Sequence, residues 1–258
     1  MTVQFKLEDH VARVTIDRPE RLNAVDAATE AALIEIWQRV ERDRDIRVVV
    51  VTGAGERAFS VGADMKDDND ARPGLDYWAA PRPGGFGGLA LRDLPVPVIA
   101  RVNGHALGGA MEMVLGCDIV VAAAHATFGC PEPRVGRLAF TGGISLLPRR
   151  VGHVHAMGLL LTGRRIDAAE AYRIGLVNQV AEMADLDRTV DAWIADILAC
   201  APLTLRATKA MARAGQGLDP VTAQMLRLPE LVEALGSADQ AEGVMAFREK
   251  RAPRWTGR

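Results

Sequence analysis

Apolar and polar residues alternate along the first part of the chain. Val3, Phe5 and Leu7 share one side of an extended segment, and a second alternating stretch begins at Val11 after a polar break at residues 8–10. Alternation over a few residues is typical of a half-buried strand, because successive side chains of a strand face opposite sides. The pattern therefore predicts two short strands within residues 1–17, joined by a tight turn.

A different spacing follows Asp26. The next apolar residues recur at intervals of three and four, which places them on one face of a helix: Leu33, Ile36, Trp37 and Val40. Asp is favourable at the N-terminal cap of a helix, since its carboxylate accepts hydrogen bonds from backbone amides that lack a partner. We expect an amphipathic helix that begins after Asp26.

Three runs at residues 47–52, 97–102 and 118–123 consist mainly of consecutive apolar residues, without alternation. Such runs are typical of strands in a sheet that helices cover on both faces. From about residue 153 the pattern is helical to the end, with a capped helix start near Asp167 and amphipathic stretches at 186–200 and 203–214. The predicted fold class is α/β, with strands and helices first and helices alone afterwards.

Composition excludes several classes of protein. The chain has 258 residues, of which 49% are hydrophobic and 25% charged, and its formal net charge is −2. These values are typical of a globular protein that buries its core without disulfides or metals, and they lack the basic excess of a nucleic-acid binder. The three cysteines form no CxxC pair, so we expect no metal, no disulfide and a reducing, cytoplasmic setting. We also expect no signal peptide, and no membrane span because no apolar run approaches ~20 residues.

Residues 66–88 are rich in Asp, Gly, Pro and Arg. Connections of this length without regular structure are usually functional lids or disordered segments. The apolar residues in this one are Tyr77, Trp78 and Phe86, so we expect it to fold over an apolar ligand.

The segment at residues 102–113 is the most informative about function. After a strand and a glycine-containing turn, Gly108 and Gly109 open an apolar helix, and Glu112 lies about one turn inside it. Backbone amides at a helix start bind anions because they have no partner within the helix. The alternative is that the glycines only allow close packing and Glu112 is a solvated acid, since an isolated glycine-rich turn is a weak signal. We expect His105 to be a turn residue that contacts backbone rather than a catalyst.

Two further segments carry possible chemistry. Residues 58–65 are mostly small and follow a strand, so they form either a turn that exposes backbone amides or a plain strand-to-helix turn. Glu132 lies between Pro131 and Pro133, which restrict the backbone around it. That arrangement suits a positioned carboxylate or a rigid surface turn.

Taken together, the three segments combine two amide-bearing turns with two carboxylates. Two backbone N–H donors can form an oxyanion hole for an enolate or a tetrahedral oxyanion. Glu112 and Glu132, if close together, can divide the acid and base roles, because burial and mutual repulsion raise the pKa of one of them.

These residues resemble the crotonase, or enoyl-CoA hydratase/isomerase, superfamily. The resemblance implies a spiral of ββα repeats over residues 1–195. It also implies a C-terminal helical region over residues 196–258 that joins subunits into homotrimers or homohexamers. The motifs that carry it extend over nearly the whole chain: Arg18–Ala24, Ala58–Asp64, Ala106–Glu112, Pro131-Glu132, Thr162–Arg164, Gly175–Asn178 and Phe247–Arg251.

The resemblance also implies roles for single residues. The amides of Ala63 and Gly109 would form the oxyanion hole, and Glu112 and Glu132 would hold a water between them, with Glu132 delivering a proton to Cα. The implied activity is reversible addition of water to a 2-enoyl-CoA thioester, in which coenzyme A is part of the substrate and no separate cofactor is needed. The residues implied in substrate and CoA binding are Arg21, Leu22, Ala24, Ala58, Asp64, Met65, Lys66, Phe140 and Lys250.

Two positions depart from the short-chain hydratases of this family. Phe140 stands where they have a glycine near the acyl group, and Cys130, expected to be a small buried residue, replaces a glutamine. Because Phe140 is bulky, the identity of the substrate's acyl group is not determined, and a carnitinyl-type acyl-CoA dehydratase is one alternative. A Δ3-Δ2 enoyl-CoA isomerase, an acyl-CoA hydrolase and a non-catalytic acyl-CoA- or RNA-binding member are the others. Glu112 and Glu132 together favour the hydratase.

Overall fold

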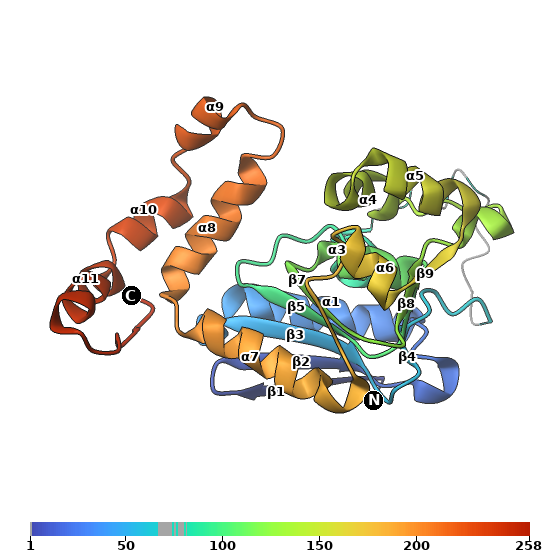
Figure 1. The fold of residues 1–258 in the computed structure, drawn as a ribbon, viewed down its shortest axis with the longest axis horizontal. Coiled ribbons are helices and arrows are strands. Elements are labelled where there is room, and N and C mark those ends of the chain that lie inside the picture. Colours follow the sequence, from blue (N-terminus) through green and yellow to red (C-terminus); the bar gives the residue numbers. More distant parts are fainter. Residues whose placement is uncertain (1, 67–73, 75, 77–79, 81) are drawn as a thin grey trace.

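The structure of the protein is a computed structural model that describes residues 2–66, 74, 76, 80 and 82–258. Tyr77 and Trp78, expected to cover a ligand, lie outside the described residues. Helices pack around two sheets, and the last helices extend away from them (Figure 1).

The first sheet has six strands in the order β1-β2-β3-β5-β7-β10. The first two strands pair antiparallel, as the alternating pattern predicted, and the remaining neighbours run parallel. The three continuous apolar runs are confirmed as its central strands. The strands are β1 (Val3–Glu8), β2 (Val11–Ile16), β3 (Val48–Gly53), β5 (Val98–Val102), β7 (Ile119–Ala123) and β10 (Gln179–Ala181).

The second sheet has four short strands in the order β4-β6-β8-β9, and only the β8–β9 pair is antiparallel. Each of β3, β5 and β7 is followed along the chain by a strand of this second sheet, and the later two units continue into helices. The predicted spiral of ββα repeats is therefore confirmed. The strands are β4 (Ala58–Ser60), β6 (His105–Leu107), β8 (Thr127–Gly129) and β9 (Arg165–Asp167).

The helix expected after Asp26 is confirmed, and the Asp26 side chain accepts a hydrogen bond from the backbone amide of Thr29 at 2.8 Å. Short 3-10 helices also occur at Pro19–Arg21, Phe86–Gly88, Glu132–Val135 and Met183–Asp185. The α-helices described are α1 (Ala27–Arg42), α3 (Gly109–Gly116), α4 (Gly143–Val151), α5 (His153–Thr162), α6 (Ala168–Arg173), α7 (Leu186–Leu198), α8 (Pro202–Ala214), α9 (Pro220–Gln224), α10 (Pro229–Leu235) and α11 (Ala238–Glu249).

Both faces of the first sheet are covered. Along β3, Val49 and Val51 belong to the main core with residues of α1 and α3, whereas Val48 and Val50 pack with residues of α7. Successive side chains of a strand face opposite sides, so a strand covered on both sides is apolar at every position. This is why residues 47–52 lack alternation.

Three expectations from the sequence were wrong in detail. The chain after residue 153 is not helical throughout, because β9 and β10 interrupt it. They span three residues each, too few for a period to be visible. Residues 58–60 form β4 rather than a turn. His105 lies in β6, not in a turn, and its Nδ1 lies 2.8 Å from the Thr127 hydroxyl rather than contacting backbone.

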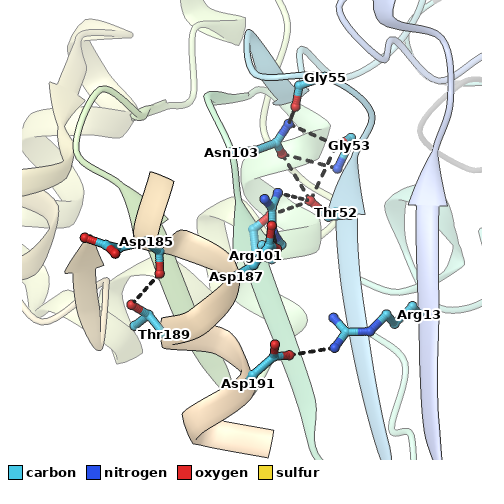
Figure 2. A network of polar contacts seen from close by, with 10 residues as sticks. All are labelled: Arg13, Thr52, Gly53, Gly55, Arg101, Asn103, Asp185, Asp187, Thr189 and Asp191. Carbon is cyan, nitrogen blue, oxygen red and sulfur yellow. Dashed lines mark hydrogen bonds and ion pairs between the residues drawn. The ribbon is translucent and has the colours of Figure 1, made fainter. Parts of the chain in front are cut away.

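A polar network ties α7 to the first sheet (Figure 2). Arg101 on β5 donates to Asp187 of α7 at 2.7 Å and to the Thr52 hydroxyl of β3 at 3.3 Å. Arg13 of β2 pairs with Asp191 one turn further along α7. Two arginines of the sheet thus connect it to α7 through ion pairs.

Helices α8–α11 extend away from the sheets (Figure 1). Their own buried cluster is small: Leu203, Ala207 and Ala234. They also carry exposed large apolar side chains, among them Phe247 at 86% exposure. Within the described part of the chain, no helix is both long and apolar enough to cross a membrane.

Candidate active site

Two backbone turns that are far apart in sequence lie against each other. A Cβ added to Gly62 would lie 2.9 Å from the carbonyl oxygen of Leu107 and 3.0 Å from the amide nitrogen of Gly109. The turn after β4 can approach the start of α3 this closely only because it has a glycine there. The predicted juxtaposition of the two segments is therefore present.

The turns leave two amides available. Val25 donates to the Gly62 carbonyl at 2.8 Å and accepts from Asp64 at 3.0 Å, so that the Ala63 N–H between them has no hydrogen-bond partner among the described residues. Gly109 is the first residue of α3, so its N–H has no partner within the helix. Both residues line the same cleft.

Buried asparagines that do not line the cleft hold the loop that leads into β4. Asn103, at the end of β5, donates to the carbonyls of Gly53 at 2.9 Å and Gly55 at 2.7 Å (Figure 2). Asn23 donates to the Ala58 carbonyl at 2.7 Å. These bonds give hydrogen-bond donors to carbonyls of this loop. A buried carbonyl without a donor would lower the stability of the fold.

An ion pair fixes the other side of the Ala63 turn. The Arg18 guanidinium lies 3.0 Å from a carboxylate oxygen of both Asp26 and Asp64, and all three side chains are largely buried. The Arg18 guanidinium thus holds both the N-terminal cap of α1 and the turn that carries Ala63.

Glu112 projects from the first turn of α3 and is 3% exposed. Its Oε1 accepts from the Gly143 amide at 2.9 Å, and its Oε2 accepts from the Thr141 hydroxyl. Burial raises the pKa of this carboxyl above its usual range, and the two hydrogen bonds act against that rise because they stabilise the charged form. The solvated-acid interpretation of Glu112 is therefore wrong.

Glu132 begins the 3-10 helix Glu132–Val135, and Pro131 and Pro133 flank it. Its Oε2 is buried without a hydrogen-bond partner among the described residues. Burial, with a smaller contribution from the negative charge of Glu112, raises the pKa of Glu132 to about 7. A carboxyl group poised near neutrality can both donate and accept a proton at ordinary pH.

The two carboxyl groups belong to one site. A Cβ added to Gly108 would lie 3.4 Å from Glu132 Oε1, and one added to Gly143 would lie 3.4 Å from Glu112 Oε1 and 3.6 Å from the Cys130 sulfur. Cys130 is buried, as expected, and both glutamates act with burial to raise the pKa of its thiol. A thiol held neutral in this way contributes packing rather than a nucleophile.

These groups line a cleft of about 690 Å³. Apolar side chains supply much of its wall, including Phe86, Phe140 and Leu138. Phe86 packs so closely on Gly109 that an added Cβ there would lie 2.5 Å from its ring. An apolar wall with a few converging polar groups is the usual form of a small-molecule site.

Of the residues that the sequence singled out, the structure brings together Ala63, Met65, Gly109, Glu112, Glu132 and Phe140, all of which line the cleft. The remainder do not line it. Ala24 and Ala58 are buried in the supporting loops, and Asp64 is held by Arg18. Arg21, Leu22 and Lys66 lie outside the cleft near the Ala63 turn, and Lys250 follows α11 at the far end of the chain.

The sequence did not single out Thr141 or three arginines of the cleft wall, Arg82, Arg134 and Arg137. Thr141 lies 29 residues from the carboxylate that it contacts, so no local spacing connects the two. Each arginine lies in a loop or a short 3-10 helix, where basic residues are ordinarily solvated and give no signal.

The chain is similar to known proteins over its whole length. The family model described as enoyl-CoA hydratase/isomerase matches residues 6–258. The chain is 40% identical to (E)-benzylidenesuccinyl-CoA hydratase of Thauera aromatica over 100% of both chains. It is 37% identical to carnitinyl-CoA dehydratase of Proteus mirabilis over 96% of this chain and 95% of that one. A solved structure of enoyl-CoA hydratase from Mycobacterium tuberculosis superposes with a TM-score of 0.91 at 35% identity, covering 100% of this chain and 99% of the other.

Proposed function

This chain belongs to the enoyl-CoA hydratase/isomerase family and is a lyase of the enoyl-CoA hydratase type, and we propose that it hydrates a 2-enoyl-CoA thioester whose acyl group is bulkier than crotonyl. One observation carries the proposal. Two buried carboxyl groups, one with a pKa near neutrality, face a cleft that also holds two unpartnered backbone amides.

The amides of Ala63 and Gly109 receive the thioester oxygen. As water adds to Cβ, charge moves onto that oxygen, and the resulting enolate-like oxyanion is stabilised by the two N–H groups. Removing one such donor typically raises a barrier by about 3–4 kcal/mol. Neither amide needs to move, because the Val25 bonds and the start of α3 already hold both in position.

The two glutamates handle the protons. Glu112 has both oxygens engaged by Thr141 and Gly143, which keeps its carboxylate oriented. In the proposed reaction, Glu112 accepts a proton from water while the hydroxyl forms its bond to Cβ. Glu132, with its pKa of about 7, gives a proton to Cα. Glu112 then carries one extra proton and Glu132 lacks one, and exchange with water returns both groups to their starting states. Dehydration is the same path in reverse.

The proposal for a bulky acyl group rests on the side chains of the cleft wall and on the names of the relatives. Phe140 and Leu138 are large apolar side chains on the wall of the cleft that also holds the two amides. The relatives named as acting on benzylidenesuccinyl-CoA and carnitinyl-CoA support a substituted acyl group. A carnitinyl-type dehydratase, the alternative left open by Phe140, would run the proposed steps in reverse, so it differs from the leading proposal in acyl identity rather than in mechanism.

We propose further that the chain forms homotrimers or homohexamers in a reducing, cytoplasmic setting. Support for assembly comes from apolar side chains exposed on α9–α11: Val221, Met225, Val232, Leu235 and Phe247. Support for the setting comes from three free thiols, of which Cys200 is exposed. A monomer mass in light scattering would contradict the assembly.

The proposed function is tested by measuring hydration of crotonyl-CoA and cinnamoyl-CoA. The readout is the loss of the ultraviolet absorbance of the conjugated thioester. We expect turnover with both, faster with cinnamoyl-CoA, and a loss of at least ~100-fold in Glu132→Gln. Equal rates for the parent and Glu132→Gln would contradict the assignment of the proton donor. No absorbance change with either thioester would favour an isomerase with the same oxyanion hole, whereas an absorbance loss accompanied by release of free CoA thiol would favour a hydrolase.

A further inference from the structure

The cleft that holds the two glutamates also holds three cationic side chains. Arg82, Arg134 and Arg137 line it, and no lysine or aspartate does so among the described residues. The transfer of protons to and from an enoyl thioester gives none of these arginines a task. Three guanidinium groups in the same cleft, in addition to the two carboxyl groups and two amides that the proposed reaction uses, therefore indicate a second recognition element.

Arg134 is held in place by its surroundings. Its Nε donates to the carbonyl oxygen of Thr162 at 3.1 Å. Its aliphatic stem crosses Gly163 so closely that a Cβ added to that glycine would lie 3.0 Å from Arg134 Cγ. The side chain thus spans from the Glu132 helix to the end of α5, and its position depends on a glycine with a φ of +59°.

Arg82 and Arg137 are also tied to the reacting centre. Arg82 lines the same cleft as Glu112, and its positive charge acts against the rise that burial causes in the pKa of this carboxyl. Arg137 follows the same 3-10 helix as Glu132, and its backbone amide donates to the Glu132 carbonyl at 2.9 Å. Each arginine is therefore linked to one of the two catalytic glutamates.

From this arrangement we infer that Arg82, Arg134 and Arg137 bind a carboxylate on the acyl group, so that the preferred substrates are CoA thioesters of dicarboxylic acids. Guanidinium groups match carboxylates in geometry and charge, and such bonds are about twice as strong as neutral ones. The inference rests on the proposed function, since it assigns the acyl group of that same cleft.

The phosphates of coenzyme A share this anionic chemistry and are the other possible source. The whole pantetheine chain separates them from the thioester, whereas the three arginines line the same cleft as the glutamates that act on the acyl carbons next to the thioester. The position of the arginines therefore favours an anion on the acyl side.

Binding of saturated thioesters tests the inference without requiring turnover. Isothermal titration calorimetry would compare glutaryl-CoA and adipoyl-CoA with their monomethyl esters, in which a methyl group replaces the terminal negative charge. We expect each diacid to bind roughly tenfold to a hundredfold more tightly than its ester, the scale of one hydrogen bond to a charged group. In Arg134→Gln and Arg137→Gln the ratio of the ester's Kd to the diacid's Kd should fall towards one. Arg188→Gln, which changes an exposed arginine of α7 paired with Asp185, is the matched control and should keep it.

A second arm separates the two sources of negative charge. The adipoyl thioester of pantetheine carries the carboxylate but no phosphate, so the effect of Arg137→Gln should persist with it. Equal binding of acid and ester would overturn the inference, and so would an arginine effect that appears only when the phosphates are present. If the ratio is confirmed but no 2-enoyl-CoA is hydrated, the carboxylate site stands and the hydratase proposal fails.

Discussion

Thr141 offers the sharpest test of how the cleft tunes its catalytic base. Its hydroxyl donates to Glu112 Oε2, and the Gly143 amide donates to the other oxygen at 2.9 Å. Thr141 is 6% exposed and Glu112 3%, so water has little access to replace a lost bond. Thr141→Val removes the hydroxyl at nearly constant volume.

The expected shift follows from the strength of that bond. A hydrogen bond to a charged group contributes about 1.5–3 kcal/mol, and a change of one pKa unit corresponds to about 1.36 kcal/mol. The bond stabilises the charged form, so its loss raises the pKa of Glu112, by about 1–2 units. If ionised Glu112 takes the proton from water, the acidic limb of the kcat/KM profile moves to higher pH by the same amount.

The assay is hydration of crotonyl-CoA or cinnamoyl-CoA by absorbance across the pH range, for the parent, Thr141→Val and Thr141→Ser. Ser keeps the hydroxyl and should return the acidic limb to its original position. An unmoved limb in Thr141→Val would refute the reasoning. A loss of activity that is equal at every pH would do so as well, since it would indicate a structural effect rather than an effect on the ionisation of Glu112.

Two further predictions concern the same site. Because the pKa of Glu132 is raised from 4.5 to about 7, the folded protein is favoured with this group protonated, and that stability is lost as pH rises from about 4.5 through 7. Glu132→Gln should thus gain roughly 1–2 kcal/mol over the parent at pH 8, after allowance for partial exposure of the group. No gain should appear at pH 4, and urea unfolding at both pH values measures the difference. Gly108 has φ 60° and ψ −131°, a conformation strained for any residue with a Cβ. Gly108→Ala should shift the start of α3 and lower kcat by about 100-fold or more with an unchanged circular dichroism spectrum. Full activity in that variant would show that the Gly109 amide does not need this turn.

Features that depend on a few neighbouring residues could be predicted from the sequence. The alternation before residue 17, the helical spacing after Asp26 and the apolar run at 47–52 each report burial over one element, and each element formed where expected. Asp26 and Asp167 cap the helices that follow them, because a cap is a hydrogen bond to an amide two or three residues away.

The site could be predicted in part for a related reason. Gly108, Gly109, Glu112 and Glu132 lie in motifs whose residue types and order already limit the chemistry. Their resemblance to a known family then implied how they meet. Composition and spacing alone left Glu112 open to interpretation as a solvated acid, because nothing within a few residues reveals that α3 buries its first turn.

The rest was decided by contacts between distant parts of the chain. The strands β9 and β10 are three residues long and exist because β8 and β7 offer edges on which to pair. The bond between Thr141 and Glu112 and the meeting of Arg82 with Arg134 in one cleft join segments that no period connects. The amino-acid sequence by itself determined the elements, their caps and the types of reacting group, since these depend on local burial and local hydrogen bonds. Only the packing of the two sheets and their helices decided which side chains share a desolvated cleft, and hence which carboxyl group titrates near neutrality.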